Sequence, residues 1–382
     1  MLQSSERILT THVGSLPRPK PVLELLLRKG RGEPYDEAAF DAEIARAVDE
    51  IVARQVEIGL DVVSDGEISK IGYATYVKDR LSGFEGHHPR PPALDLAPHP
   101  ELREAIARMT GPQQFRRPAC VGPIEVVDRS ALDKDLANLR DAVARHRPGE
   151  AFMNAASPGV ISAFQRNSYY PTHEAYVDAI AAAMREEYEA IVAAGFLLQL
   201  DCPDLAMARH TGFQKLSEAE FLRRAEYQVE ALNGAVRNIP AESMRMHVCW
   251  GNYEGPHDHD IPLEKILGIV LRAKPQAVLF EAANPRHRHE WAVFEAARIP
   301  DDKILVPGCI MSTTNYVEHP ELVAQQLCQY ADLVGRERVI AGTDCGFGTF
   351  AGTARVDPGV AFKKLRSLVE GAERASKRLW RR

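Results

Sequence analysis

Short apolar runs alternate along the chain with longer segments whose apolar residues recur every three or four positions. The short runs predict β-strands near residues 8, 62, 153, 198, 247, 279, 305 and 340. The longer segments predict α-helices, for example one that is capped by Asp36 and ends at Gly59. Non-alternating apolar strands followed by helices are typical of parallel strands buried on both faces. The pattern therefore predicts an α/β fold consisting of a single TIM (β/α)8 barrel.

A doubly wound open sheet is the runner-up, and it is disfavoured because no Gly-x-Gly-x-x-Gly follows the first strand. The alternation lapses once, from about residue 83 to residue 123, where eight of the 25 prolines lie together with His87, His88 and His99. We interpret this segment as a Pro/His-rich insertion after the second βα unit, with solvated histidines. No repeat or low-complexity linker interrupts the rest, so residues 1–382 are expected to form one domain.

Composition and charge exclude several classes of function. A hydrophobic content of 45% with 26% charged residues indicates a soluble globular protein, and a net charge of −6 without a basic stripe argues against a nucleic-acid partner. No apolar run approaches the roughly 20 residues that a membrane helix needs. The N-terminus is polar and lacks a secretory h-region, so a cytoplasmic protein is expected, in which the six cysteines are buried or bind metal.

Polar or reactive groups follow nearly every predicted strand, where a barrel places its functional residues. These strand-end groups are Gly14-Ser15, Asp65-Gly66-Glu67, Ser157-Pro158, Asp201, His247-x-Cys249, Glu281, Pro307-Gly308-Cys309 and Asp344-Cys345.

Four of them, His247, Cys249, Glu281 and Cys345, form a possible tetrahedral zinc site with one nitrogen, two sulfur and one oxygen ligand. Taken singly, each has a plainer explanation, since a buried cysteine is usually a small hydrophobic residue and Glu281 could pair with Arg286. Their matched positions at strand ends favour a metal site, and two thiolates favour zinc over hard cations. Zinc that accepts a substrate thiol would hold it as a nucleophilic thiolate, which points to alkyl transfer to sulfur.

These residues resemble, in order and in placement, the catalytic C-terminal barrel of the cobalamin-independent methionine synthase family. The resemblance covers most of the chain and rests on Val13 to Pro17, Asp65-Gly66-Glu67, Leu200-Asp201-x-Pro203, His247-x-Cys249, Glu281 and Thr343 to Gly346. It implies zinc as the cofactor on His247, Cys249, Glu281 and Cys345. It also implies a homocysteine pocket formed by Gly14, Ser15, Glu67 and Asp201. Two carboxylates and a hydroxyl suit the ammonium group of an amino acid, and the exposed amides of Gly14 and Ser15 suit its carboxylate.

The donor half of the family pattern is not reproduced. Cys202 stands where the family has Glu in Asp-Glu-Pro, and Met207 occupies the position of an acidic residue associated with folate. Phe164 aligns with the Trp of the folate-stacking segment, and Thr313 occupies the position of the proposed proton donor. The catalytic residue is therefore left open.

Three functions remain open from the sequence. The first is methylation of homocysteine to methionine, with a donor of the folate or methyl-cobalamin type. The second is alkylation of another zinc-bound thiol, as in the related epoxyalkane:coenzyme M transferases, and the third is non-catalytic zinc and thiol binding. Ser15, Glu67 and Asp201 favour the first, because coenzyme M has a sulfonate and no ammonium group. The oligomeric state is left open.

Four further histidines, His257, His259, His287 and His289, lie on polar segments, and we interpret them as solvated rather than as metal ligands.

Overall fold

The chain is described here from a computed structural model, which covers residues 1–88, 90–110, 117–353 and 355–381. The strands are β1 (Leu9–Thr10), β2 (Val62–Ser64), β3 (Phe84–Glu85), β4 (Ala119–Cys120), β5 (Glu150–Ala156), β6 (Leu197–Asp201), β7 (Met244–Val248), β8 (Ala277–Phe280), β9 (Ile304–Pro307) and β10 (Ile340–Ala341). The helices are α1 (Lys20–Arg31), α2 (Glu37–Ile58), α3 (Pro100–Thr110), α4 (Ser130–His146), α5 (Pro158–Phe164), α6 (His173–Ala193), α7 (Ala208–Thr211), α8 (Glu218–Ala235), α9 (Leu263–Val270), α10 (Trp291–Ala296), α11 (Pro320–Val334) and α12 (Pro358–Leu379).

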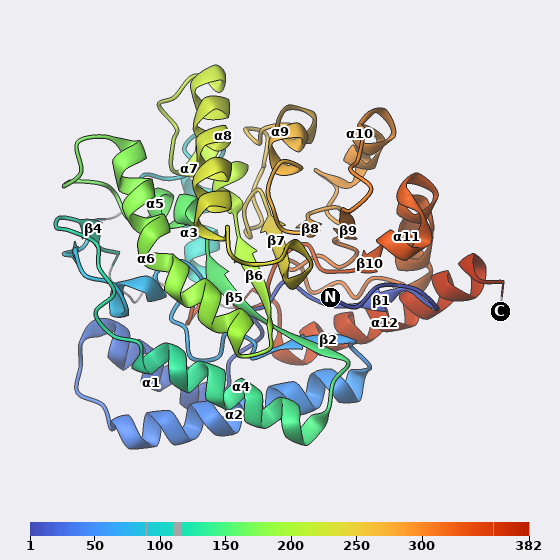
Figure 1. Ribbon diagram of the computed structural model, residues 1–382, viewed down its shortest axis with the longest axis horizontal. Helices are drawn as coiled ribbons and strands as arrows, with labels where there is room; N and C mark the ends of the chain where they lie inside the picture. Colours follow the sequence, from blue (N-terminus) through green and yellow to red (C-terminus); the bar gives the residue numbers. More distant parts are fainter. Residues whose placement is uncertain (89, 111–116, 354, 382) are drawn as a thin grey trace.

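A curled parallel sheet forms the centre of the molecule, with helices arranged around its outside (Figure 1). Six strands pair in the order β2-β5-β6-β7-β8-β9, and β1 pairs with β10 in a separate parallel ladder. Isolated parallel bridges, Leu305 to Val339 and Gly308 to Gly342, connect β9 with the segment around β10. Each strand predicted from the apolar pattern is present, which confirms a mixed α/β fold built on parallel strands.

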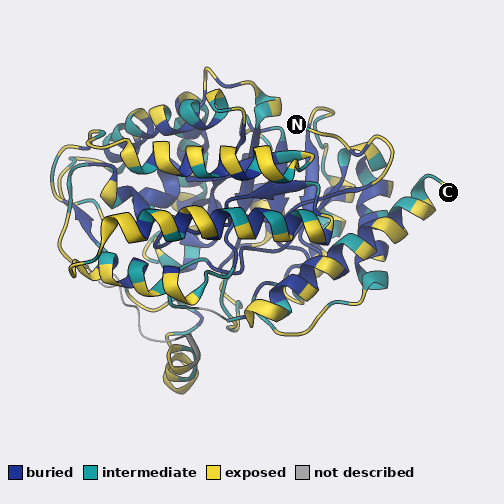
Figure 2. Ribbon diagram, turned by 90° about the horizontal axis from the view of Figure 1, so that it is seen from below, coloured by how far each residue is buried: buried dark blue, intermediate teal, exposed yellow. Residues whose placement is uncertain are grey.

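The sheet has apolar side chains on both faces, as expected for parallel strands between two layers. One large cluster fills the space between the strands and the helices, and buried residues follow the strands and the inner helix faces in Figure 2. A smaller cluster fills the concave side of the sheet and consists of Leu9, Val13, Ala277, Leu279, Ile304, Val306 and Ile340.

The helix boundaries follow the capping signals in the sequence. Asp36 accepts a hydrogen bond from the Ala39 amide at the start of α2, and Gly59 ends the helix with a φ of 95°. Ser217 and Glu220 form a capping box at the start of α8. Gly59 suits its position because a left-handed backbone is strained for residues with a Cβ atom.

The segment from about 83 to 123 does not follow the second βα unit, as the sequence predicted. It contains β3, α3 and β4, with β3 and β4 antiparallel, and it lies between β2 and α4. It is therefore inside the second βα unit, on the loop after the strand, and not after the unit as the sequence indicated. Helix α4 was not among the predicted helices, although its buried Leu132, Leu136 and Leu139 recur at helical spacing. Residues 89 and 111–116 of the segment lie outside the described residues.

Its place on a βα loop puts this segment at the carboxyl ends of the strands. Hydrogen bonds fasten it to the rest of the barrel, among them Leu94 N to the His210 oxygen at 3.0 Å, Gln214 Nε2 to the Pro92 oxygen at 2.7 Å, and Tyr253 Oη to Asp95 at 2.6 Å. Among the described residues, no helix is both long enough and apolar enough to cross a bilayer.

Candidate functional site

Three of the four predicted zinc ligands meet at the carboxyl ends of the strands. His247 lies on β7 and Cys249 just beyond it, while Cys345 lies on the loop after β10. One ligand atom from each residue lies within 4.8 Å of the other two, and all three residues are buried. Residues 247 and 249 share a face because alternate residues of a strand point to the same side. The sheet therefore brings together two sequence segments that are almost one hundred residues apart.

The His247 imidazole is suited to metal binding by its burial. Burial, together with the positive charge of Arg245, lowers the pKa of His247 to about 3, so the ring is neutral at pH 7. Neither ring nitrogen has a hydrogen-bond partner among the described residues. A buried polar atom without a partner is costly, and a neutral imidazole nitrogen is a common metal ligand.

The two cysteine sulfurs also fit a cation. A hydrogen bond with Cys345 and then burial raise the pKa of the Cys249 thiol well above its usual value, and the nearby Glu281 raises it further. Two thiolates this close would repel each other unless a positive ion lay between them. One nitrogen and two sulfurs form the donor set that zinc accepts in three-ligand sites.

Glu281 follows β8 and is buried, but its oxygens are directed elsewhere in this structure. Oε1 accepts a hydrogen bond from the Trp250 amide at 2.7 Å, and Oε2 accepts one from Asn284 Nδ2 at 2.7 Å. Burial raises the pKa of Glu281. Its carboxylate is not part of the group formed by His247, Cys249 and Cys345, so its role as a fourth ligand stays a prediction.

The predicted acidic pocket is adjacent to the candidate metal site. Ser15, Glu67 and Asp201 line the same cavity of about 330 Å³ as His247, Cys249 and Cys345. The register of β6 against β7 pairs Asp201 directly with His247, which explains this proximity.

Both carboxylates are buried, and this controls their protonation. Burial, together with the nearby Asp201, raises the pKa of Glu67 to about 8, and burial raises the pKa of Asp201 to about 6. Glu67 Oε2 has no hydrogen-bond partner among the described residues, and its backbone has a φ of 54°. A left-handed backbone at a non-glycine residue is a strained conformation that is found most often at functional sites.

Two residues that were not identified from the sequence hold Asp201 in place. Asn154 Nδ2 donates to both carboxylate oxygens, at 3.3 and 3.1 Å, and Gln199 Nε2 donates to Oδ1 at 3.1 Å. These bonds lower the Asp201 pKa and so oppose the effect of burial. A polar side chain inside an otherwise apolar strand was the available signal.

The Gly14-Ser15 turn places the Ser15 side chain in the cavity and brings the Gly14 backbone close to the Asn154 side chain. Ser15 lines the cavity, and its Oγ accepts a hydrogen bond from the Gly348 amide at 3.3 Å. Gly14 does not line the cavity. It has a φ of 146°, and a Cβ atom there would overlap the Asn154 side chain, so this position requires glycine.

The other side of the cavity is aromatic and basic, and we call it the wall. It consists of Tyr73, Arg90, Arg117, Phe164, Phe350 and Arg355. Met207 and Phe164, the two residues at donor positions of the family pattern, both line the cavity. Thr313 does not line it, whereas the preceding Ser312 does.

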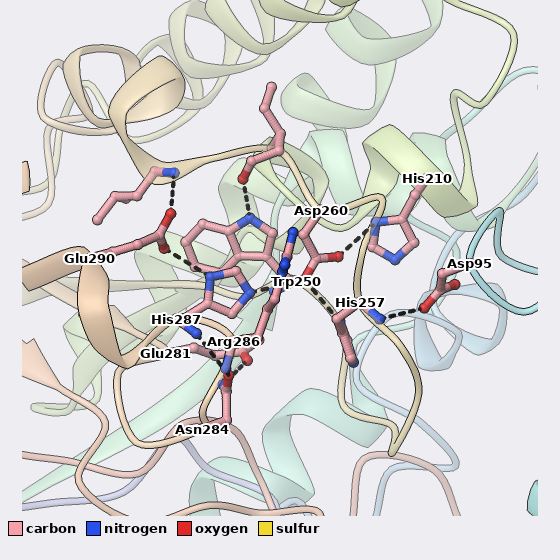
Figure 3. A network of polar contacts seen from close by, with 12 residues as sticks. Asp95, His210, Trp250, His257, Asp260, Glu281, Asn284, Arg286, His287 and Glu290 are labelled. Carbon is pink, nitrogen blue, oxygen red and sulfur yellow. Dashed lines mark hydrogen bonds and ion pairs between the residues drawn. The ribbon is translucent and has the colours of Figure 1, made fainter.

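The interpretation of His257 and His287 as solvated is wrong. His287 Nε2 lies 2.9 Å from Asp260 Oδ2 and its Nδ1 lies 2.8 Å from Glu290, while His257 Nδ1 also contacts Asp260 at 2.9 Å (Figure 3). The His287 ring stacks on Trp250 with a centroid distance of 4.1 Å. Although burial opposes protonation, the bonds to the two carboxylates raise the pKa of His287 to about 10. This network supports Trp250, whose amide holds Glu281.

Comparison with known proteins gives relatives over nearly the whole chain, although no family profile matches it. A methionine synthase of Saccharolobus solfataricus is 26% identical over 373 residues, which cover 95% of this chain and 93% of the relative. One of Sulfurisphaera tokodaii is 24% identical over 372 residues, covering 95% and 91%.

Solved structures give the same fold. A B12-independent methionine synthase from Shewanella sp. W3-18-1, in complex with selenomethionine, has a TM-score of 0.75 at 19% identity and covers 98% of this chain and 100% of its own. A putative vitamin-B12 independent methionine synthase from Listeria monocytogenes has a TM-score of 0.65 at 18% identity, covering 96% and 98%. Full-length relatives of one name, together with the motif order described above, support the methionine synthase family for this chain.

Proposed function

We propose that this protein transfers a methyl group to the thiol of homocysteine and so produces methionine. The observation that carries this proposal is the single cavity shared by His247, Cys249 and Cys345 on one hand and Glu67 and Asp201 on the other. The first group suits a thiol and the second suits an ammonium group, and homocysteine has both. The names of the full-length relatives support the same reaction.

The metal that we propose is zinc, on His247, Cys249 and Cys345, with Glu281 as the fourth ligand. Zinc bound there would lower the pKa of the substrate thiol and so keep it as a thiolate at neutral pH. Glu281 would have to leave its hydrogen bond with Trp250 or Asn284 to reach the ion. The orphaned nitrogens of His247 support a metal in this position.

The remaining polar groups would bind the amino-acid part of homocysteine. Glu67 and Asp201 would accept hydrogen bonds from its ammonium, and the Ser15 hydroxyl and amide would contact its carboxylate. In the transfer, the sulfur lone pair forms the new S–C bond and the donor–C bond breaks with its electron pair staying on the donor. The proton lost by the thiol balances the charge left on the donor, and no group is oxidised or reduced.

We also propose that the chain is one domain and that its strands close into a TIM barrel. The β1–β10 ladder and its bridges to β9 support closure on one side. On the other side, the Asp61 amide donates to the Thr10 oxygen at 3.1 Å, which joins the ends of β1 and β2. The segment 83–123 would then be a loop of the barrel.

The proposal is tested by a screen of the purified protein with homocysteine and a set of methyl donors, and with coenzyme M and an epoxide. We expect about one zinc per chain and methionine as the product with homocysteine. Alkylated coenzyme M without any methionine would overturn the proposal in favour of the epoxyalkane transferase reaction. Zinc and homocysteine binding without turnover by any donor would leave a thiol-binding protein.

A further inference from the structure

A buried lysine, Lys70, lies on the segment after β2, three residues beyond Glu67. It is 2% exposed, and its Nζ donates a hydrogen bond to the backbone oxygen of Asn154 on β5. The ammonium also lies over the ring of Tyr76, 4.5 Å from the ring centroid. Lys70 does not line the cavity that contains the candidate metal ligands, so it lies behind the strand ends and not among the groups that a substrate would touch.

Lys70 and Tyr76 take the place of a neighbouring strand at the end of β5. The pairing of β5 with β2 ends at Phe152, so the later residues of β5 have no partner on that strand. There the Asn154 oxygen accepts a hydrogen bond from Lys70, and the Ala156 amide donates to the Tyr76 hydroxyl at 3.3 Å. These two bonds hold the carboxyl end of β5 where the β2 ladder no longer does.

The end of β5 matters because it orients Asp201. Asn154 Nδ2 donates to both carboxylate oxygens of Asp201, at 3.3 and 3.1 Å, and to the Val13 oxygen at 2.9 Å. In the ladder between β5 and β6, Ala156 is the register partner of Asp201. The bond from Lys70 uses the backbone of Asn154 and leaves its side chain free, so a single residue connects the lysine with the carboxylate.

The charge of Lys70 acts on Glu67 and Asp201, the two carboxylates proposed to bind the substrate ammonium, without an ion pair. Burial raises the pKa of both carboxyl groups, and the positive charge of Lys70 opposes this effect. Within the part of the chain that the structure describes, the ammonium makes no hydrogen bond or ion pair with a carboxylate. Arg80, which is also buried, instead pairs with two carboxylates, at 2.6 and 2.9 Å. Lys70 therefore offsets buried negative charge without occupying the carboxylate oxygens.

We propose that Lys70 is a positioning residue for the amino group of homocysteine: it holds the end of β5, from which Asn154 orients Asp201, and it leaves the carboxylate oxygens to the substrate. This inference rests on the proposed methyl transfer to homocysteine and adds a residue that touches neither the substrate nor the metal. The ammonium end of the substrate depends on Lys70, whereas the thiol end, at the candidate metal site, does not.

The test separates the two ends of the substrate with a pair of thiols. Homocysteine is compared with 4-mercaptobutyrate, which is homocysteine without its amino group. Dissociation constants for both thiols are measured on the zinc-loaded protein in the absence of a methyl donor, for the unmodified chain and for Lys70→Met and Lys70→Gln. Zinc content is recorded for each protein, and kcat and KM for homocysteine are measured with a donor that supports turnover.

We expect homocysteine to bind both variants about tenfold more weakly, because Asp201 loses its orientation and the carboxylates lose a compensating charge. The affinity for 4-mercaptobutyrate should change by less than about twofold, since no ammonium group has to be bound. Zinc content should stay unchanged, and together with the retained binding of 4-mercaptobutyrate it shows that the variants fold. In turnover, KM for homocysteine should rise while kcat stays nearly constant, because the reacting sulfur lies at the other end of the substrate.

Lys303→Met is the matched control. Lys303 is 4% exposed and its Nζ also donates to backbone oxygens, those of Ala273 and Pro275, but it precedes β9 and does not line the cavity. Both thiols should bind this variant as they bind the unmodified protein. A double variant with Asp201→Asn completes the design, because Lys70→Met should have little further effect once the carboxylate is removed.

Three results would overturn the inference. An equal loss of affinity for both thiols, or a loss of zinc, would assign Lys70 to the fold alone. Unchanged homocysteine affinity in both variants would mean that Asp201 is oriented without Lys70. Fully additive losses in the double variant would mean that Lys70 acts on a group other than Asp201. The proposed function fails separately, when the unmodified protein binds no homocysteine or yields no methionine with any donor.

Discussion

The floor and the wall of the cavity are built in different ways. The floor consists of His247, Cys249, Cys345, Glu67 and Asp201, and each of these lies at or just beyond the carboxyl end of a parallel strand. The wall depends on a long loop within the second βα unit and on the loop after β10. Sheet register determines the floor, for example by pairing Asp201 with His247, whereas the wall is fastened to the barrel by scattered hydrogen bonds.

This difference indicates that the fold constrains the acceptor half of the reaction more strongly than the donor half. A side chain on a strand end is held by the ladder on both sides, so its position changes only if the sheet changes. A loop tolerates insertion and substitution because few contacts depend on it. We therefore expect the floor to fix the thiol chemistry, and the wall, which lines the rest of the same cavity, to contact the methyl donor.

The largest effect is expected for Cys345→Ser, which removes a floor ligand. The variant leaves His247, Cys249 and the proposed ligand Glu281, with only one thiolate among them, so metal content and activity should both fall steeply. Metal analysis of chelator-free protein, with activity at saturating donor, measures this. Cys309→Ser is the matched control, since Cys309 is equally buried at the end of β9 but outside the ligand group. Full zinc retention by Cys345→Ser would remove it from the site.

Glu67→Gln should affect the acceptor without affecting the metal. Losing one charged hydrogen bond to the ammonium should weaken homocysteine binding about 10- to 100-fold, with zinc content and donor affinity unchanged. Calorimetric titration with homocysteine measures the loss. Asp204→Asn serves as the control, because Asp204 is a buried acid near Asp201 that does not line the cavity. Unchanged homocysteine affinity in Glu67→Gln would exclude Glu67 from the pocket.

The floor could be predicted from sequence because strand periodicity and strand ends are local features. His247, Cys249, Cys345, Glu67 and Asp201 were all recognised in this way, and the structure brings them to one cavity. The orientation of the Glu281 carboxylate could not be predicted, because it depends on hydrogen bonds with Trp250 and Asn284.

The network around Asp260 and the wall could not be predicted either. His257 and His287 lie on polar segments, and only long-range contacts, with Asp260 for both and with Trp250 for His287, leave His287 buried and His257 partly buried. Arg90 was one charge in a proline-rich stretch, and its contact with Phe164 joins residues that are far apart in the chain. Long-range packing of this kind has no local sequence pattern.

A pH series sharpens the assignment of the floor. Glu67 and Asp201 have pKa values raised to about 8 and about 6, so both lose protons as the pH rises from 6 to 8. Only the ionised forms attract an ammonium group, and affinity for methionine, which has no titrating thiol, should therefore rise about tenfold over this range. Equilibrium dialysis measures it, and Glu67→Gln should flatten the curve. An affinity that falls with pH would contradict the assignment.

The smallest effect is expected from loosening the wall alone, with Tyr253→Phe. The Tyr253 hydroxyl donates to Asp95 at 2.6 Å and ties the segment 83–123 to the loop after β7. Asp95 keeps its bond from the His257 amide at 3.0 Å, so the segment should stay folded while Arg90 and Arg117 become less well ordered. Preorganised groups bind more tightly, and losing one hydrogen bond should weaken donor binding about two- to tenfold.

The matched control for this variant is Tyr227→Phe, which breaks a similar bond to Asp178 at 2.8 Å between α8 and α6, away from the cavity. Donor affinity should change only in Tyr253→Phe, and homocysteine affinity should change in neither variant. An equal loss of donor and homocysteine affinity in Tyr253→Phe would mean that wall and floor move as one unit. The division of the cavity into a rigid acceptor half and an adaptable donor half would then be wrong, because a change confined to the loop would have reached the strand ends.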